Sequence, residues 1–296
     1  MTLNNHKSGF VAIVGKPNAG KSTLLNAFLG EKLSIVTPKA QTTRHRILGI
    51  LNDENFQIVF SDTPGIIKPK YELQKSMMKF VSYSLEDADL IICVVDANDA
   101  ENPDEDTLSG IGKIQALKIL VINKIDISTE TQVSEKQAWG QKVGFFKEII
   151  QISALTKINV NQLLNSIVGY LPEHPAYYDK EDLSDRTERF FAAEIIREKI
   201  FLNYQQEIPY SCEVIVSGFK DKPDISVVSA EIIVERDSQK GIIIGKNGES
   251  LKKISTQARL ALEEFLGKKV FLETHVRVVK DWRSNPSQLK KFGYEM

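Results

Sequence analysis

The 296-residue sequence is poor in cysteine, has no long apolar run and carries almost no net charge. Its two cysteines, Cys93 and Cys212, lie far apart in apolar segments, so we expect buried thiols in a reducing compartment rather than a disulfide or a metal site. No apolar run approaches the roughly 18 residues that cross a bilayer. Because 38 basic residues nearly balance 39 acidic ones, the overall charge identifies no class of partner. We therefore expect a cytoplasmic globular protein, of a length typical of two domains.

The first half of the sequence alternates short apolar runs with segments of helical periodicity. Runs such as 90–95 are apolar throughout, which is typical of strands covered on both faces. We therefore expect an α/β domain with a doubly wound, mostly parallel six-stranded sheet and one antiparallel edge formed by the first hairpin. Strands are expected at 10–14, 46–51, 56–61, 89–96, 117–122 and 147–152, and helices at 21–29, 73–85, 103–114, 132–142 and 159–170.

The alternation ends near residue 174, which we take as the end of a first domain, 1–174. The proline-containing and acidic stretch 175–185 is expected to be a linker, and 186–296 a second, α+β domain of order α-β-β-α-α-β. Its expected elements are a helix at 187–203, strands at 211–219 and 227–236, a helix at 249–266 and a strand at 270–279, followed by a basic tail.

Residues 15–22 have the sequence G-x-x-x-x-G-K-S and lie between a predicted strand and a predicted helix. This is the P-loop pattern in the context that it requires. Glycines let several backbone N–H groups converge on a polyphosphate, and the helix N-terminus adds partial positive charge. We expect Lys21 to contact the β and γ phosphates and Ser22 to hold Mg²⁺. The alternative is a plain strand-to-helix turn.

Three later motifs narrow the choice of nucleotide. Asp62 ends a predicted strand as the first residue of D-x-x-G, where a carboxylate binds Mg²⁺ through water, although Asp-x-Pro-Gly is also ordinary turn chemistry. Asp126, in N-K-x-D, can accept two parallel hydrogen bonds from guanine, a pair that adenine lacks. The alternative for Asp126 is a polar helix cap with Ser128. The run 153–155, S-A-L, can offer backbone amides to the guanine carbonyl.

With these four motifs in order, the chain resembles the translation-factor-related GTPases. The resemblance implies that 31–46 is switch I and 62–82 switch II, both held by the γ-phosphate and released by hydrolysis. It also implies that a switch I threonine, Thr43 or alternatively Thr42, closes over Mg²⁺, so the expected metal ligands are Ser22, Thr43 and Asp62. The residues expected to bind GTP are Gly15, Lys16, Pro17, Asn18, Ala19, Gly20, Lys21, Ser22, Thr23, Asp62, Thr63, Pro64, Gly65, Ile66, Asn123, Lys124, Asp126, Ser153, Ala154 and Leu155.

The residue after Gly65 departs from the Ras-type pattern. Ile66 stands where a glutamine would orient the attacking water, and because isoleucine cannot hydrogen-bond water we expect slow intrinsic hydrolysis. In the subgroup that carries G-x-P-N-x-G-K-S, the asparagine matching Asn18 helps bind a K⁺. The resemblance therefore implies K⁺ beside Mg²⁺, and expected catalytic roles for Lys21, Thr43, Asn18 and Gly65. The alternative is that Asn18 only shapes the loop.

The second domain contains G-x-x-G at 245–248 between two helical segments, and such a loop clamps single-stranded nucleic acid in KH modules. The preceding isoleucine run, the lysine within the loop and the element order favour a type II KH domain over a simple turn. Twelve basic residues against five acidic ones between 240 and 291 agree with phosphate contact. The expected RNA contacts are Gly241, Ile244, Gly245, Lys246, Asn247, Gly248, Lys252, Lys253 and Arg259.

A GTPase domain followed by one C-terminal type II KH domain is similar to the Era family of bacterial ribosome-assembly GTPases, and residues 39–46, KAQTTRHR, are close to that family's switch I. The resemblance implies a monomeric GTP-hydrolysing switch that binds 16S rRNA near its 3′ end, acts in assembly of the 30S subunit and contacts the inner membrane peripherally. Three alternatives remain: a metabolic P-loop enzyme such as a kinase, a GTPase acting on tRNA, and an RNA-binding scaffold in which GTP is structural.

Overall fold

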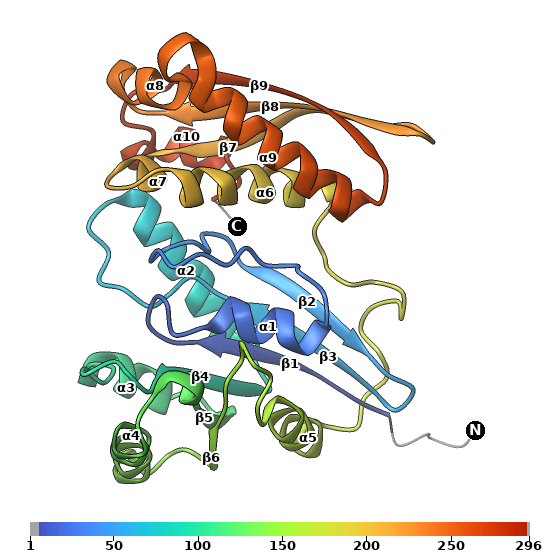
Figure 1. The fold of residues 1–296 in the computed structure, drawn as a ribbon. Helices are drawn as coiled ribbons and strands as arrows, with labels where there is room; N and C mark the ends of the chain where they lie inside the picture. Colours follow the sequence, from blue (N-terminus) through green and yellow to red (C-terminus); the bar gives the residue numbers. More distant parts are fainter. Residues whose placement is uncertain (1–5, 295–296) are drawn as a thin grey trace. The chain divides into compact units, whose positions relative to one another are not determined.

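The computed structural model of the chain describes residues 6–294, which separate into two compact units (Figure 1). Within these residues, the first unit contains 6–69 together with 77–185, and the second contains 70–76 together with 186–294. No helix within 6–294 is both long enough and apolar enough to span a membrane.

The first unit is built on a six-stranded sheet in the order β2-β3-β1-β4-β5-β6. The strands are β1 Lys7–Val14, β2 Ile47–Asn52, β3 Phe56–Asp62, β4 Leu90–Asp96, β5 Leu117–Asn123 and β6 Glu148–Gln151. Only the β2–β3 pair is antiparallel among these strands, and the other neighbours run parallel. The predicted mostly parallel six-stranded sheet with one antiparallel edge is confirmed.

Helices cover both faces of this sheet (Figure 1). They are α1 Lys21–Leu29, α2 Glu72–Glu86, α3 Glu105–Gly112, α4 Glu130–Val143 and α5 Val160–Tyr170, with the short η1 Ile125–Ile127 after β5. One face packs on α2, α3 and α4 in a core that includes Ala12, Cys93 and Leu120. Helices α1 and α5 contact each other on the opposite face. Because β1, β3, β4 and β5 are parallel, the segments that follow them gather at one edge, where doubly wound sheets bind ligands.

The stretch expected to be a linker is hydrogen-bonded along the outer edge of β2. Ile50 donates its backbone N–H to the carbonyl of Leu183 at 2.9 Å, and the Ser184 hydroxyl donates to the carbonyl of Leu48 at 2.6 Å. Residues 177–185, called the strap below, therefore satisfy backbone groups that an edge strand would leave open.

Gln57 attaches the first residues of the strap to β3. This side chain is fully buried, and its Oε1 accepts from the backbone N–H groups of Tyr177 at 2.7 Å and Tyr178 at 3.0 Å. Its Nε2 donates to the carbonyl of Tyr178 at 2.8 Å. A buried amide with several partners of this kind fixes the position of the backbone that it contacts.

The second unit has a three-stranded sheet, β7 Glu213–Asp221, β8 Ile225–Val234 and β9 Lys269–Val278, in that order. The β7–β8 pair is antiparallel and the β8–β9 pair is parallel. Helices α6 Glu188–Asn203, α8 Asp237–Ile244 and α9 Glu249–Leu266 share one core with the sheet, in which Ile196, Ile232 and Ala258 are fully buried or nearly so. This is the predicted order α-β-β-α-α-β. The short α7 Ile208–Ser211 and η2 Lys246–Gly248 are additional to it.

The end of the chain, expected only as a basic tail, is folded. It forms η3 Trp282–Ser284 and α10 Pro286–Lys291. Asn285 caps α10 through its side chain, and proline at the first helical position fits a helix start. Trp282 is fully buried and donates its indole N–H to the carbonyl of Ser211 at 3.0 Å. The lysines of this segment are exposed, and apolar residues between them, such as Leu289, anchor it.

Candidate functional site

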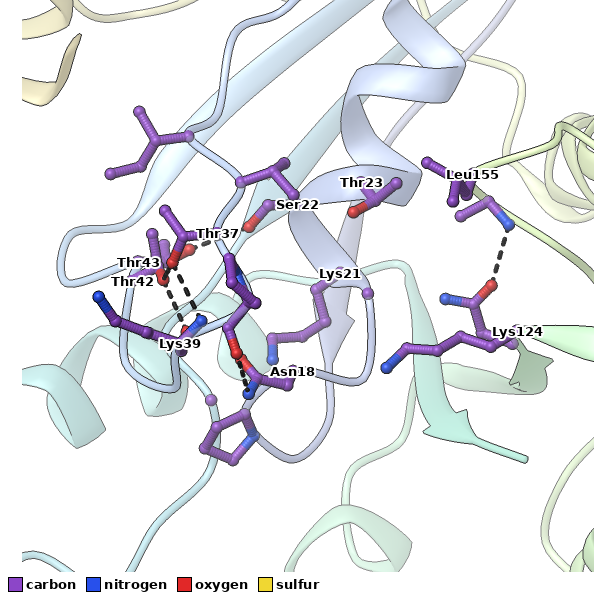
Figure 2. Close-up of a pocket in the computed structure, with 18 of the residues that line it drawn as sticks. Asn18, Lys21, Ser22, Thr23, Thr37, Lys39, Thr42, Thr43, Lys124 and Leu155 are labelled. Atoms are coloured by element: carbon purple, nitrogen blue, oxygen red, sulfur yellow. Dashed lines mark hydrogen bonds between the residues drawn. The ribbon is translucent and has the colours of Figure 1, made fainter. Parts of the chain in front are cut away.

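Polar segments that follow four strands of the first unit meet at one cavity of about 430 Å³. In Figure 2 the segment that begins at Lys21 lies between two walls, one carrying Thr37 to Thr43 and the other Lys124 and Leu155. Residues 35–39 and 41–43 of the predicted switch I line the first wall. The predicted GTP-binding residues that line this cavity are Pro17, Asn18, Gly20, Lys21, Ser22, Thr23, Gly65, Asn123, Lys124, Asp126, Ala154 and Leu155.

The other predicted GTP-binding residues do not line the cavity themselves; they are Gly15, Lys16, Ala19, Asp62, Thr63, Pro64, Ile66 and Ser153. The side chain of Lys16 pairs with Asp99 at 3.1 Å instead. Ile66 and the backbone of Gly15 border a second, mainly apolar cavity of about 410 Å³. The backbone N–H of Ile66 donates to the carbonyl of Gly15 at 3.0 Å, which ties the start of the predicted switch II to the P-loop.

Lys21, the first residue of α1, is the buried cation of the cavity. Its ammonium group donates to the carbonyl oxygens of Gly15 at 3.1 Å and Lys16 at 2.8 Å. Burial lowers the pKa of Lys21 from 10.5 to about 8. The nearby Asp62 charge only partly offsets this effect of burial, and a polyphosphate would supply further negative charge beside the ammonium group.

Ser22, Thr43 and Asp62 place oxygen atoms together beside Lys21. The Ser22 hydroxyl donates to Oδ2 of Asp62 at 2.7 Å and lies 2.9 Å from the hydroxyl of Thr43. Thr42 also lines the cavity, but its hydroxyl donates to the carbonyl of Lys39 at 2.8 Å rather than to this group. Burial raises the pKa of Asp62, and its Oδ1 is buried without a hydrogen-bond partner. Two hydroxyl groups beside a buried carboxylate form a set of oxygen ligands of the kind that Mg²⁺ prefers.

Asn123 joins three of the segments that form the cavity. Its side chain is buried, its Nδ2 donates to the carbonyl of Ala19 at 2.9 Å, and its Oδ1 accepts from the backbone N–H of Ala154 at 2.9 Å. Gly20 has a positive φ of 97°, and a Cβ there would lie 2.1 Å from Nδ2 of Asn123, so the approach requires glycine. Sequence reasoning grouped Asn123 with the base-reading motif and missed this bridging role.

The far wall of the cavity combines a carboxylate with exposed apolar side chains. Lys124 has a left-handed backbone with φ 66°, and its ammonium donates to Asp96 at 2.6 Å, while Asp126 is exposed at the cavity. Leu155 is 77% exposed and Ile127 is 70% exposed, yet both line the cavity. Apolar side chains left open beside a hydrogen-bonding carboxylate form a surface that a planar base can cover.

Asn18 connects the P-loop to the predicted switch I (Figure 2). Its backbone is left-handed, with φ 63°, and its Nδ2 donates to the carbonyl of Pro38 at 3.1 Å. The orientation of the amide leaves Oδ1 as the atom of Asn18 that can coordinate a cation.

The G-x-x-G loop of the second unit connects α8 to α9. Gly245 has φ 71°, and a Cβ there would lie 2.2 Å from the hydroxyl oxygen of Ser250, so the position requires glycine. Gly248 is the N-cap of α9 with φ 79°, and a Cβ there would meet nothing within 4 Å. Lys246 and Asn247, between the two glycines, are exposed. The loop therefore places one ammonium group at the N-terminus of an 18-residue helix, although the N–H groups of Gly245 and Gly248 are bonded to the carbonyls of Gly241 and Gly245.

The predicted RNA contacts differ in how accessible they are. Ile244 is only partly exposed and packs against the core of the second unit, and Arg259 pairs with Glu263 at 2.9 Å. The guanidinium of Arg259 is therefore less suited to phosphate contact than the lysines are. The exposed members of the predicted set are Gly241, Lys246, Asn247, Lys252 and Lys253.

Two protein-family models match the chain. Residues 10–124 match the model described as "50S ribosome-binding GTPase", and residues 207–283 match the model described as "KH domain". The first match falls on the first unit except for residues 70–76, and the second match lies within the second unit.

Relatives match this chain over all or nearly all of its length. "GTPase Era" of Geotalea daltonii is 46% identical over 297 residues, covering 100% of each chain, and "GTPase ERA1, chloroplastic" of Zea mays is 46% identical over 98% of this chain and 71% of the relative. The crystal structure of Era in complex with MgGDPNP and nucleotides 1506–1542 of 16S ribosomal RNA matches with a TM-score of 0.94 and 43% identity, over 98% of this chain and 100% of that one. An Aquifex aeolicus Era variant bound to GDP·AlF4⁻ matches with a TM-score of 0.93 and 43% identity. The chain therefore belongs to the Era family of GTPases, with an N-terminal GTPase domain and a C-terminal KH domain.

Proposed function

We propose that this GTPase is a switch that binds the 3′ end of 16S rRNA through its KH domain and acts in assembly of the 30S ribosomal subunit. The full-length match to Era bound to MgGDPNP and nucleotides 1506–1542 of 16S rRNA is the observation that carries this proposal. The domain model that matches residues 10–124 refers to the 50S subunit, but it covers the GTPase domain alone. The match that includes the RNA-binding domain is therefore the more informative one.

In this proposal, the cavity of the GTPase domain binds GTP with Mg²⁺. Lys21 neutralises the phosphates, and Asp126 accepts the two hydrogen bonds that distinguish guanine from adenine. Ser22, Thr43 and Asp62 would hold Mg²⁺, which would neutralise charge that develops on the phosphates. The unpartnered Oδ1 of Asp62 supports this choice, because a buried carboxylate oxygen without a partner is costly.

K⁺ is the proposed substitute for an arginine finger. Ile66 has no hydrogen-bonding group for water, so charge in the transition state needs another source. Asn18 supports a cation site because its amide nitrogen is already bound to the carbonyl of Pro38. Replacing Asn18 with alanine should remove any difference in kcat between KCl and NaCl buffers. Equal kcat values in the two salts for the unmodified protein would exclude the K⁺ role while leaving GTP hydrolysis in place.

Gly245 to Gly248 form the proposed RNA clamp. A side chain at Gly248 would project into open space beside the N-terminus of α9, where a phosphate would lie. Gly248→Asp should therefore weaken RNA binding by at least about tenfold, since a carboxylate repels phosphate at close range. GTP hydrolysis should persist, because the loop belongs to the other unit. RNA binding that survives this substitution would exclude the clamp.

The identity of the RNA is tested by crosslinking RNA to the protein in cells and sequencing it. We expect reads from the 3′ end of 16S rRNA, and fewer of them with Gly248→Asp. Recovery of tRNA instead would contradict the role in subunit assembly. The switch itself is tested separately, by comparing RNA affinity in complexes with GDP and with a non-hydrolysable GTP analogue. Equal RNA affinities in the two complexes would show that the nucleotide does not control RNA binding, although GTP binding and RNA binding would both remain.

A further inference from the structure

The short turn η1 carries Asp126, and hydrogen bonds to one carbonyl close this turn. Ile127 donates its backbone N–H to the carbonyl of Lys124 at 3.2 Å, and the hydroxyl of Ser128 donates to the same carbonyl at 2.7 Å. Asp126 lies between these residues, and its exposed side chain lines the nucleotide cavity. The direction of its carboxylate therefore depends on how firmly Lys124 and Ser128 are held.

Two side chains at the end of β4 hold both ends of this turn. Asp96 is the last residue of β4, and its Oδ2 accepts from the ammonium group of Lys124 at 2.6 Å. Its Oδ1 accepts from the backbone N–H of Asn98 at 2.9 Å and from Nδ2 of Asn98 at 3.3 Å. The same Nδ2 donates to the hydroxyl of Ser128 at 2.8 Å. Because Ser128 donates in turn to Lys124, these four residues form a closed ring of hydrogen bonds.

The directions of the hydrogen bonds in this ring are mutually consistent. The amide nitrogen of Asn98 has two hydrogens, one for Asp96 and one for Ser128, and the hydroxyl of Ser128 accepts one bond while donating another. All four residues of the ring are partly buried, but Asp96, Asn98 and Ser128 do not line the nucleotide cavity. Any effect of Asn98 on the nucleotide must therefore act through the turn that carries Asp126.

We propose that Asn98 is a positioning residue for recognition of the guanine base. It holds Ser128 at one end of the turn and supports Asp96, which holds Lys124 at the other end. The carboxylate of Asp126 is thereby directed at the base before the nucleotide binds, so less conformational freedom is lost on binding. The inference rests on the proposed function, since it takes Asp126 as the group that distinguishes guanine.

The test compares the affinities of the full-length protein for GDP and for inosine diphosphate, each measured by competition with a fluorescent GDP. Inosine diphosphate keeps the phosphates, the ribose and the N1–H but lacks the 2-amino group, so the ratio of the two dissociation constants reports one hydrogen bond to Asp126. A bond to a charged group should make this ratio about 10–100 in the unmodified protein. Asn98→Ala should reduce it by at least about threefold, because hydrogen bonds weaken steeply when misaligned. An unchanged ratio would overturn the proposal.

Two substitutions of Ser128 test the same contact from its other side. Ser128→Ala should also reduce the ratio, and Ser128→Thr should preserve it because threonine keeps the hydroxyl. Since Asn98 acts through Ser128, the double alanine variant should reduce the ratio by less than the product of the two single reductions. Reductions that multiply fully, or a loss in Ser128→Thr as large as that in Ser128→Ala, would contradict the ring as the positioning device.

Thr129→Ala is the matched control for general stability. Thr129 directly follows Ser128 and is the N-cap of α4, where its hydroxyl accepts from the backbone N–H of Gln132 at 3.3 Å. Its loss should lower the melting temperature without changing the ratio, because the cap is not part of the ring. If Thr129→Ala reduces the ratio as much as Asn98→Ala does, the effect is one of local stability and the role of Asn98 is refuted.

Asp126→Ala distinguishes failure of this inference from failure of the base-reading assignment. It should bring the ratio close to one, since the carboxylate that receives the 2-amino group is gone. If Asp126→Ala keeps the ratio of the unmodified protein, Asp126 does not read the base, and the role of Asn98 fails with it. If Asp126→Ala loses the discrimination while Asn98→Ala keeps it, only the role of Asn98 fails.

Discussion

The buried ammonium of Lys21 makes nucleotide binding depend on pH above neutrality. In the free protein burial lowers the pKa of Lys21 to about 8. Bound phosphates place negative charge beside the ammonium, which raises its pKa in the complex. The contribution of the charged lysine to affinity is thus fully present below the pKa of the free protein and falls progressively as pH rises from that pKa to the higher pKa of the complex. Binding at alkaline pH must take up a proton.

The size of the effect follows from the free-protein pKa. At about pH 8.5, roughly three quarters of the free protein has a neutral Lys21, compared with roughly a tenth at pH 7. GDP binding should therefore take up about 0.75 proton at the higher pH and about 0.1 at the lower, provided that the complex remains fully protonated. The dissociation constant for GDP should rise about fourfold between these two pH values.

Isothermal titration in two buffers of different ionisation enthalpy measures this proton uptake directly. EDTA should be present, so that metal binding at Asp62 does not contribute its own proton exchange to the measurement. The pH should stay below the range in which guanine itself loses a proton. Lys21→Arg is the matched control, because a guanidinium stays charged throughout and should show no uptake. Absence of uptake by the unmodified protein at about pH 8.5, or equal uptake by Lys21→Arg, would refute the reasoning.

Three substitutions test other parts of the GTPase domain. Asp126→Asn should weaken GTP binding by about 10²–10⁴-fold, because two hydrogen bonds to a charged group are lost, and should favour xanthine nucleotides in a competition assay. Asn123→Ala should lower the free energy of unfolding of the nucleotide-free protein by about 2–4 kcal/mol, measured in urea, since it leaves the buried carbonyl of Ala19 and the N–H of Ala154 unpaired. Gln57→Leu should speed hydrogen exchange of the Ile50 N–H by releasing the strap, and unchanged exchange would contradict the attachment described above.

Much of the fold could be predicted because its signals are local. Helices α1 and α9 begin and end where the sequence predicted, since a glycine with positive φ stands on each side of both helices. The strands of the sheet were predicted within three residues at either end, because their apolar runs are bounded by polar segments. Each of the four nucleotide motifs could likewise be recognised from a few consecutive residues that directly follow a predicted strand.

Buried polar contacts could not be predicted in this way. Gln57 is fully buried but lies about 120 residues from its partners in the strap, and a glutamine in a strand gives no sign of its exposure. Asn26 likewise lies in a helical pattern and Ser34 in a polar loop. Neither position indicates that the Asn26 side chain hydrogen-bonds the backbone of Ser34. The α10 helix differs, because Asn285 followed by proline was an available signal for its start.

The strap has a consequence for dividing this protein into fragments. A fragment that ends at residue 174, the boundary suggested by hydrophobic pattern, lacks the segment that pairs with β2. The N–H of Ile50 and the carbonyl of Leu48 would then face solvent along an exposed edge strand, which is a template for pairing with another chain. A fragment that ends at residue 185 retains its own edge partner, whereas one that ends at 174 offers that edge to a second copy and should self-associate.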